Sequence, residues 1–222
     1  MTDNRRETVD AVLARRQPDL TVLAEKLHKP RNFSAIVRSC DAVGINQVHA
    51  VPGEDGLSVH WNTSQGAEKW MNVQTHSSLS EACGHLRGQG FQLVAAHLSD
   101  RARDYREIDY RVPTALVVGT ELFGVSDEAL AESDLQVMIP MKGMTQSLNV
   151  SVACAIVLYE ALRQREEAGL YSGPRLDEEI LKVQRFEWLH PVVARFCRER
   201  GIDYPEIDAA GNVIGSFPRS CP

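Results

Sequence analysis

The apolar positions of the chain alternate between short continuous runs and segments in which they recur every three or four residues. Continuous runs are typical of buried strands, whereas the wider spacing is typical of helices that pack by one face. The runs predict strands at 20–27, 45–51, 91–98, 114–118 and 136–139. The wider spacing predicts helices at 8–16, 33–43, 79–87 and 150–168, and one or two more within 176–200. This alternation favours an α/β fold, with a mainly parallel sheet and helices on both of its faces.

Residues with known preferences for helix ends support several of these helices. Asn32 is a suitable N-cap for the helix that follows it, and Gly44 is placed to end that helix. Either Ser147 or Asn149 can cap the long helix after them. Ser126, which two acidic residues follow, is expected to open a further short helix.

Composition narrows the class of protein. The chain has 222 residues, of which 43% are hydrophobic and 24% charged, as in globular proteins and unlike disordered chains. Its longest mainly apolar stretch, 150–162, is far shorter than the ~20 residues that a membrane-spanning helix needs. The first ten residues contain no apolar segment of the kind that secretory signals carry. We therefore expect neither a membrane span nor a secretory signal.

The cysteines indicate a reducing compartment. There are five of them, scattered along the chain without a C-x-x-C pair: Cys40, Cys83, Cys154, Cys197 and Cys221. An odd number without metal-ligand spacing predicts neither a disulfide framework nor a zinc site.

The charge of the chain is unevenly distributed. A net charge of -6 and an isoelectric point of about 5.7 argue, taken alone, against a nucleic-acid partner. Residues 1–40, however, carry a net charge of +3, while residues 41–159 carry -7. Further basic residues gather in 160–200, among an equal number of acidic ones. Both ends of the chain can therefore provide RNA contacts, although ordinary solvated helix faces explain the same pattern.

Two loops are candidate binding elements. Residues 119–126 and 139–149 each follow an apolar strand and are rich in glycine or small polar residues. Ligands of α/β sheets bind beyond the carboxyl ends of the strands, where such loops lie. Neither loop contains GxxxxGK[ST] or GxGxxG, the common phosphate-binding patterns. Spacing alone leaves open that both are ordinary connections with helix caps.

Three segments together resemble the motifs of the SpoU class of SPOUT methyltransferases. The first motif, N-x-S-A-I-x-R-x-x-D-A-x-G, matches residues 32–44, and the second, G-x-E-x-x-G-V-S, matches residues 119–126. The third, I-P-M-x-G-x-x-Q-S-L-N-V-S-V-A, matches residues 139–153. Flanking segments resemble the branch of the family that methylates guanosine 18 of tRNA: 15–22, 28–30, 163–165 and 168–171. The resemblance covers about residues 5–175.

This resemblance implies a fold, a cofactor and a reaction. It implies a deep trefoil knot at about 114–168, which binds S-adenosylmethionine, and a homodimer. It divides the chain into an RNA-contacting extension (1–19), a SPOUT catalytic domain (20–172) and a helical extension (173–222). The implied reaction is methyl transfer to the ribose 2'-hydroxyl of guanosine 18 in the tRNA D-loop, in the cytoplasm. No metal is expected, because the sulfonium already makes the methyl group electrophilic. Methylation of ribosomal RNA, or a catalytically silent RNA-binding protein on this fold, stays open as an alternative.

The resemblance also assigns roles to residues. The cofactor pocket is expected to comprise Gly119, Glu121, Ile139, Met144, Ser147, Leu148 and Asn149. The expected RNA contacts are Arg15, Arg16, His28, Lys29, Arg163 and Arg165. Arg38 matches the family's catalytic arginine, and Asn32 is expected to hold it or the ribose. A guanidinium keeps its proton to a pKa above ~12, so we expect Arg38 to orient a phosphate and stabilise the developing alkoxide. Glu121 and Asn149 are expected to shape the site, and Asn32 and Asn149 could serve as N-caps alone.

Overall fold

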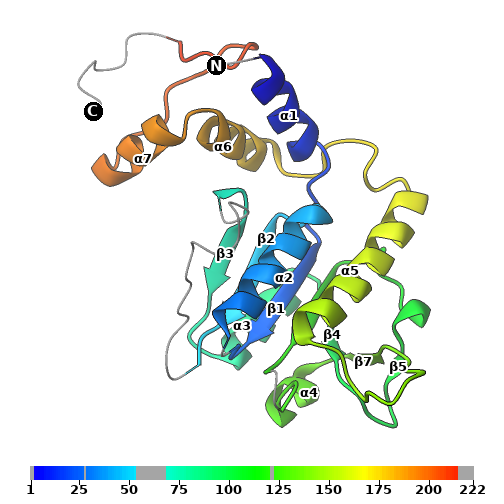
Figure 1. Ribbon diagram of the computed structural model, residues 1–222. Helices are drawn as coiled ribbons and strands as arrows, with labels where there is room; N and C mark the ends of the chain where they lie inside the picture. The colour runs from blue at the N-terminus through cyan, green and yellow to red at the C-terminus, as the bar shows by residue number, and fades with distance from the viewer. Residues whose placement is uncertain (1–2, 28, 54–68, 121–122, 215–222) are drawn as a thin grey trace. The chain divides into compact units, whose positions relative to one another are not determined.

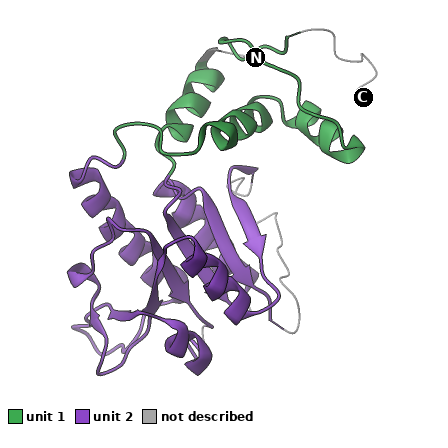
Figure 2. Cartoon of the chain, turned by 180° about the vertical axis from the view of Figure 1, so that it is seen from behind, with its two compact units in different colours: residues 1–16, 171–222 green, residues 17–170 purple. Residues whose placement is uncertain are grey.

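A computed structural model describes residues 3–27, 29–53, 69–120 and 123–214 of the chain. Figure 2 shows its division into two compact units. The larger unit comprises residues 17–170, and the smaller one combines residues 1–16 with residues 171–222. The two ends of the chain, which the sequence analysis treats as separate extensions, thus belong to one unit.

The described residues of the larger unit form a seven-stranded sheet in which all neighbouring strands run parallel. The strands are β1 (Leu20–Glu25), β2 (Gln47–Val51), β3 (Asn72–Thr75), β4 (Gln92–Ala96), β5 (Arg103–Asp104), β6 (Thr114–Val118) and β7 (Leu135–Met138). Their order across the sheet is β3-β2-β1-β6-β4-β7-β5 (Figure 1). The predicted parallel sheet is confirmed. The sequence pattern does not predict β3 and β5, because both are short edge strands whose side chains are only partly buried.

Helices cover both faces of the sheet. Every side chain of β1 and β6 is buried, as in a central parallel strand that is covered on two sides. On one face α2 (Pro30–Ala42) and α5 (Val150–Glu167) pack against the sheet and against each other. On the other face lie α3 (Leu79–Gly88) and α4 (Asp127–Glu132) (Figure 1). The predicted two-sided arrangement is confirmed, while the knot at 114–168 stays a prediction.

Two of the predicted N-caps hold their helices as expected. The Ser126 hydroxyl accepts the Ala129 N–H of α4 at 3.1 Å. The Asn149 side-chain oxygen accepts the Ser151 N–H of α5 at 2.9 Å. Gly44, with φ +80°, follows α2 in the left-handed conformation that glycine favours.

The prediction that Asn32 caps α2 is wrong. The cap is Lys29, and Pro30 begins the helix. Proline suits this position because its φ is already helical and its missing N–H would have no partner within the helix. Asn32 therefore lies inside the first turn, where its side chain is available for contacts outside the helix.

The smaller unit contains three helices among its described residues: α1 (Asp3–Leu13), α6 (Glu178–Leu189) and α7 (Pro191–Arg200). Helix α1 packs against α6. Arg185 donates to the Asp10 carboxylate at 2.6 Å, and Arg5 donates to the Trp188 carbonyl at 2.9 Å. These polar contacts join segments more than 170 positions apart in the sequence.

Membrane spans, metal-binding clusters and disulfides are absent among the described residues. No helix among them is long and apolar enough to cross a membrane. No group of three or more His, Cys, Asp or Glu side chains in this part of the chain could hold a metal ion. Its four cysteines are buried and form no disulfide: Cys40, Cys83, Cys154 and Cys197.

Three histidines form a cluster between α3 and the strands β2 and β3. His49 Nδ1 and His76 Nε2 lie 2.9 Å apart, and both residues are buried. The ring of His85 lies 5.6 Å from that of His49 and 5.4 Å from that of His76. Burial, together with the two neighbouring histidines, lowers the pKa of His49 to about 4. Burial also lowers the pKa of His76, although the nearby Glu81 carboxylate partly opposes it.

The protein is expected to lose stability as the pH falls from about 6.5 towards 4. In this range the unfolded chain binds a proton at His49 that the folded chain excludes, so protonation favours unfolding. The lowered pKa corresponds to about 3 kcal/mol in the free energy of unfolding. Urea unfolding at pH 7 and at pH 4 measures the loss, which should be smaller in His49→Leu. An equal loss in that variant would contradict the assignment to His49.

Candidate functional site

A pocket with a volume of about 570 Å³ opens at the carboxyl ends of three neighbouring strands. Ala96 of β4, Val118 of β6 and Met138 of β7 line its base. Its walls come from two loops, residues 119–126, here named the second-motif loop, and residues 139–149, the third-motif loop. The described residues of these loops that line the pocket are Gly119, Thr120, Phe123 and Gly124 of the first, and Ile139, Met141, Gln146, Ser147, Leu148 and Asn149 of the second. Volumes of this order are typical of small-molecule sites. The pocket therefore lies where an α/β sheet is expected to bind a ligand.

The second-motif loop closes tightly on itself. The Thr120 N–H donates to the Gly124 carbonyl at 2.8 Å, and the Gly124 N–H donates back to Thr120 at 2.9 Å. Gly124 has a φ of +70°, which glycine adopts without strain. A Cβ atom on Gly119 would lie 1.9 Å from the Gly124 carbonyl oxygen. Both glycines are therefore required by the shape of this wall.

The third motif meets the first through two asparagines. Asn149 caps α5 with its side-chain oxygen, and its Nδ2 donates to Asn32 Oδ1 at 3.3 Å. The two residues are 117 positions apart. Asn32 reaches Asn149 because it lies inside the first turn of α2 and does not cap that helix. The contact joins the N-termini of α2 and α5 beside the pocket.

Most of the residues predicted to hold the cofactor line this pocket: Gly119, Ile139, Ser147, Leu148 and Asn149. Met144 does not line it, because its side chain is 100% exposed. Glu121, the remaining predicted residue, lies outside the described residues.

Several other residues that line the pocket are not among those predicted to hold the cofactor. His97 and Leu98 lie at the carboxyl end of β4, Phe123 in the second-motif loop and Gln146 in the third. The one feature of the sequence that points to these residues is their position, within a motif or at the end of a predicted strand. His97 was included in the predicted strand 91–98, whereas β4 ends at Ala96 and leaves the imidazole at the pocket.

Arg38 does not line the pocket of its own chain. It lies on α2 with an exposed side chain, six residues after Asn32. Six residues are not a whole number of helical turns, so Arg38 and Asn32 point in different directions. The structure thus brings Asn32 to the third motif and leaves Arg38 on the surface of the helix.

The six residues predicted to contact RNA differ in accessibility. Arg15 and Lys29 are exposed, and Lys29 also lines the pocket. Arg163 is exposed and forms ion pairs with Glu160 and Glu167, both at 2.7 Å. His28 lies outside the described residues.

Arg16 and Arg165 require a correction, because both are fully buried. The Arg16 guanidinium lies 5.1 Å from the centre of the Trp188 ring. Arg165 donates to Asp19 Oδ1 at 2.7 Å, and to the Gln17 side chain and the Tyr110 carbonyl at 2.9 and 2.8 Å. These guanidiniums contact protein and are not accessible to RNA.

Replacement of Arg165 by methionine is expected to lower the free energy of unfolding by about 3–5 kcal/mol, because Asp19 loses its buried partner. Arg163→Met is the matched control, two residues away on the same helix. Its ion pairs are exposed, so its loss should cost less than about 1 kcal/mol. Urea unfolding measures both. An equal loss in the free energy of unfolding of the two variants would show that the buried ion pair of Arg165 stabilises the protein no more than the exposed pairs of Arg163.

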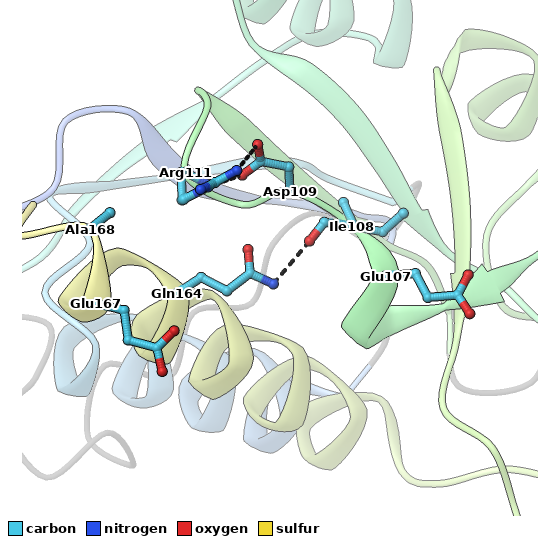
Figure 3. Close-up of a pocket in the computed structure, with 7 residues that line it drawn as sticks. All are labelled: Glu107, Ile108, Asp109, Arg111, Gln164, Glu167 and Ala168. Carbon is cyan, nitrogen blue, oxygen red and sulfur yellow. Dashed lines mark hydrogen bonds and ion pairs between the residues drawn. The ribbon is translucent and has the colours of Figure 1, made fainter.

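A second cavity, of about 360 Å³, lies between α5 and the segment before β6 (Figure 3). Figure 3 shows Gln164 pointing from α5 towards the backbone of that segment, where its Nε2 donates to the Ile108 carbonyl at 2.9 Å. Its Oε1 accepts the Tyr110 N–H at 2.9 Å. Asp109 and Arg111 form an ion pair at the rim. None of the described residues that are assigned to the cofactor or to RNA lines this cavity. The hydrogen bonds of Gln164 at the cavity connect α5 to the segment before β6.

Comparison with protein families gives two matches along the chain. Residues 19–159 match the SpoU rRNA Methylase family, and residues 163–216 match the C-terminal region named "SpoU, rRNA methylase, C-terminal". A relative from Escherichia coli K12, named tRNA (guanosine(18)-2'-O)-methyltransferase, is 46% identical over 215 residues. The match covers 96% of this chain and 94% of that relative.

Solved structures of related enzymes are also similar to the chain. The A. aeolicus TrmH/SpoU tRNA modifying enzyme has a TM-score of 0.77 and 44% identity, over 83% of this chain and 96% of that one. The SpoU methyltransferase AviRb from Streptomyces viridochromogenes, in complex with the cofactor AdoMet, has a TM-score of 0.60 and 27% identity. The match covers 68% of this chain and 59% of the AviRb chain.

Proposed function

The chain belongs to the SpoU rRNA methylase family, and on this premise we propose that it is a tRNA (guanosine-18) 2'-O-methyltransferase. It transfers a methyl group from S-adenosylmethionine to the ribose 2'-hydroxyl of that nucleotide in the D-loop. The observation that carries this proposal is the pocket at the carboxyl ends of the strands. It is lined by residues of the second and third motifs, and Asn32 of the first motif contacts Asn149 beside it.

The residues that line the pocket suit S-adenosylmethionine in their chemistry. Adenine and a sulfonium need an apolar slot with backbone hydrogen-bonding groups, and no phosphate cradle. Val118, Val137 and Ile139 supply apolar walls. Gly119 and Gly124 line the pocket without side chains and therefore present backbone groups to it. We propose that Gly119, Ile139, Ser147, Leu148 and Asn149 hold the cofactor.

The residues of the chain position the ribose and stabilise charge. When bound, S-adenosylmethionine supplies a methyl group that is already electrophilic, so the proposed transfer needs no metal. The 2'-hydroxyl is a poor nucleophile and has to be oriented. The exposed guanidinium of Arg38 is suited to bind an RNA phosphate and to stabilise negative charge that develops on the 2'-oxygen. Asn32, which Asn149 holds in place, is proposed to position the ribose.

RNA contacts are proposed at Arg15 and Lys29, whose side chains are exposed. Lys29 lines the pocket, where it can meet the backbone of the nucleotide that is methylated. Arg163 is proposed to exchange its carboxylate partners for an RNA phosphate. A tRNA substrate supports the proposal of a cytoplasmic enzyme.

We also propose a homodimer, in which α5 contributes to the interface. Val152 and Tyr159 are 46% and 54% exposed, and the partly buried Ile156 lies between them on the same stripe of the helix. Exposed apolar stripes of this kind mark interaction surfaces. The stripe lies on the helix that packs beside α2, which carries Arg38.

Tyr159→Arg is expected to shift the protein from dimer to monomer, because a charge in an apolar interface loses its hydration. Sedimentation equilibrium of the full chain measures this. Arg87→Ala, on α3, is the control and should leave the association state unchanged. A dimer of undiminished affinity in Tyr159→Arg would remove α5 from the interface.

The proposed activity is tested by methyl transfer to undermodified tRNA. We expect labelled methyl from S-adenosylmethionine to enter tRNA, and mass spectrometry of nuclease fragments to place it on the ribose of guanosine 18. Incorporation into ribosomal RNA alone would favour the related rRNA activity. Binding of both S-adenosylmethionine and tRNA without transfer would favour a silent RNA-binding protein.

A further inference from the structure

Glu25, the last residue of β1, carries a buried carboxyl group at the carboxyl end of the sheet. Only 1% of the residue is exposed. Its Oε2 accepts the backbone N–H of Ser126 at 3.1 Å, while Oε1 is buried without a hydrogen-bond partner in the described chain. Burying a carboxyl group with an unsatisfied oxygen lowers stability. Stability therefore does not explain an acidic residue here, and the hydrogen bond that its carboxyl group accepts from Ser126 is the feature to explain.

That contact reaches the second-motif loop. Ser126 is the last residue of the loop and the N-cap of α4. The first residue of the loop, Gly119, follows β6, which pairs directly with β1. The sheet therefore holds the start of the loop, and Glu25 holds its end.

The rest of the loop has few other anchors among its described residues. Gly119 and Gly124 have no side chains, and the side chain of Phe123 is 84% exposed. The hydrogen bonds between Thr120 and Gly124 close the loop on itself without fixing it to the sheet. Val125 is buried in the core, and the Glu25–Ser126 bond adds the polar contact beside it.

We propose that Glu25 is a positioning residue for the cofactor pocket. Its carboxyl group fixes the second-motif loop through the Ser126 N–H and so sets the wall that Gly119, Thr120 and Phe123 form. Glu25 does not itself line the pocket. This inference rests on the proposed function, because the ligand whose affinity it governs is S-adenosylmethionine.

The first test removes the acceptor. Glu25→Leu places an apolar side chain of similar size at the buried position, and is expected to weaken binding of S-adenosylmethionine by about 10- to 100-fold in isothermal titration calorimetry. Glu25→Gln retains an acceptor oxygen and should stay within about threefold of the original protein. Thr21→Val is the matched control. Thr21 lies buried near the other end of β1, where its hydroxyl donates to the Gln47 carbonyl at 2.7 Å. Its loss should leave the affinity unchanged.

The outcomes separate this inference from the proposed function. Equal affinities in folded Glu25→Leu and Thr21→Val would overturn the positioning role. A loss in Glu25→Gln as large as that in Glu25→Leu would overturn it too, because the acceptor would then be irrelevant. If the original protein binds no S-adenosylmethionine, the proposed function fails instead, and the second test below decides on Glu25.

The second test removes the donor and needs no cofactor. Ser126 has a φ of -69°, which proline can adopt, so Ser126→Pro deletes the N–H without backbone strain at that residue. Ser126→Ala keeps the N–H and loses only the hydroxyl cap of α4. Amide hydrogen exchange over residues 119–130 of the full chain should be faster in Ser126→Pro than in Ser126→Ala. Equal rates in the two variants would overturn the inference, even if Glu25→Leu does not fold.

Discussion

Replacing Gly119 with alanine is expected to remove nearly all binding of S-adenosylmethionine. The new Cβ would lie 1.9 Å from the carbonyl oxygen of Gly124 and 2.5 Å from the Cα of Val125. Both are backbone atoms, and two hydrogen bonds between Thr120 and Gly124 hold this part of the loop closed. The second-motif loop would have to open, and with it a wall of the pocket. We expect the affinity measured by isothermal titration calorimetry to fall by about 100-fold or more.

Gly143→Ala is the matched control for this variant. Gly143 lies in the third-motif loop but does not line the pocket, and apart from its chain neighbours no heavy atom of the described residues lies within 4 Å of the Cβ that alanine would add there. Its affinity for S-adenosylmethionine should match that of the original protein. Circular dichroism and urea unfolding establish whether Gly119→Ala retains the fold. A folded Gly119→Ala protein that binds as tightly as Gly143→Ala would contradict the close approach at this glycine.

Arg38→Ala is expected to lower the rate of methyl transfer by about 10²–10³-fold while S-adenosylmethionine binds almost unchanged. The reason is that Arg38 is exposed on α2 and does not line the cofactor pocket, whereas its proposed partners are an RNA phosphate and the reacting oxygen. Single-turnover transfer to tRNA measures the rate, and calorimetry measures cofactor affinity. Loss of cofactor binding in this variant would contradict the role assigned to Arg38.

Two further variants refine the test of Arg38. Arg38→Lys keeps the positive charge without the planar fork that binds phosphate at two points, so we expect only partial recovery of the rate. Arg87→Ala removes an exposed arginine on α3, where it pairs with Glu132, and should transfer methyl at the original rate. Full activity of Arg38→Lys would show that charge alone is required at this position.

The predictions from sequence succeed where the governing interactions are local. The strands β1 and β6 are covered on both faces, so their apolar runs identify them without knowledge of their neighbours. Asn149 caps α5 by a hydrogen bond to Ser151, only two residues away. Where two local signals compete, the prediction fails: Asn32 is a suitable cap, but Pro30 begins the helix earlier. The edge strands β3 and β5 lack the apolar pattern because each has only one neighbouring strand.

Arginines show most clearly what sequence reasoning could not decide. Arg163 and Arg165 are two positions apart and have the same chemistry, yet one is exposed and the other fully buried. The difference comes from Asp19 and Gln17, which reach Arg165 from almost 150 residues away in the sequence. The prediction of RNA contacts treats Arg163 and Arg165 alike, as residues on the surface, and is wrong for Arg165.

By itself, the sequence determined the order of the helices and of five of the seven strands, the cap of α4, and the three motifs that identify the family. Only the tertiary structure decided that Asn32 meets Asn149, that Glu25 holds Ser126, and that both ends of the chain form one unit. The physical reason is the range of the interactions. Strand and cap preferences act within a few residues, whereas these contacts join groups 117 and 101 positions apart. Burial and pairing over such separations arise only when the sheet brings the carboxyl ends of its strands together.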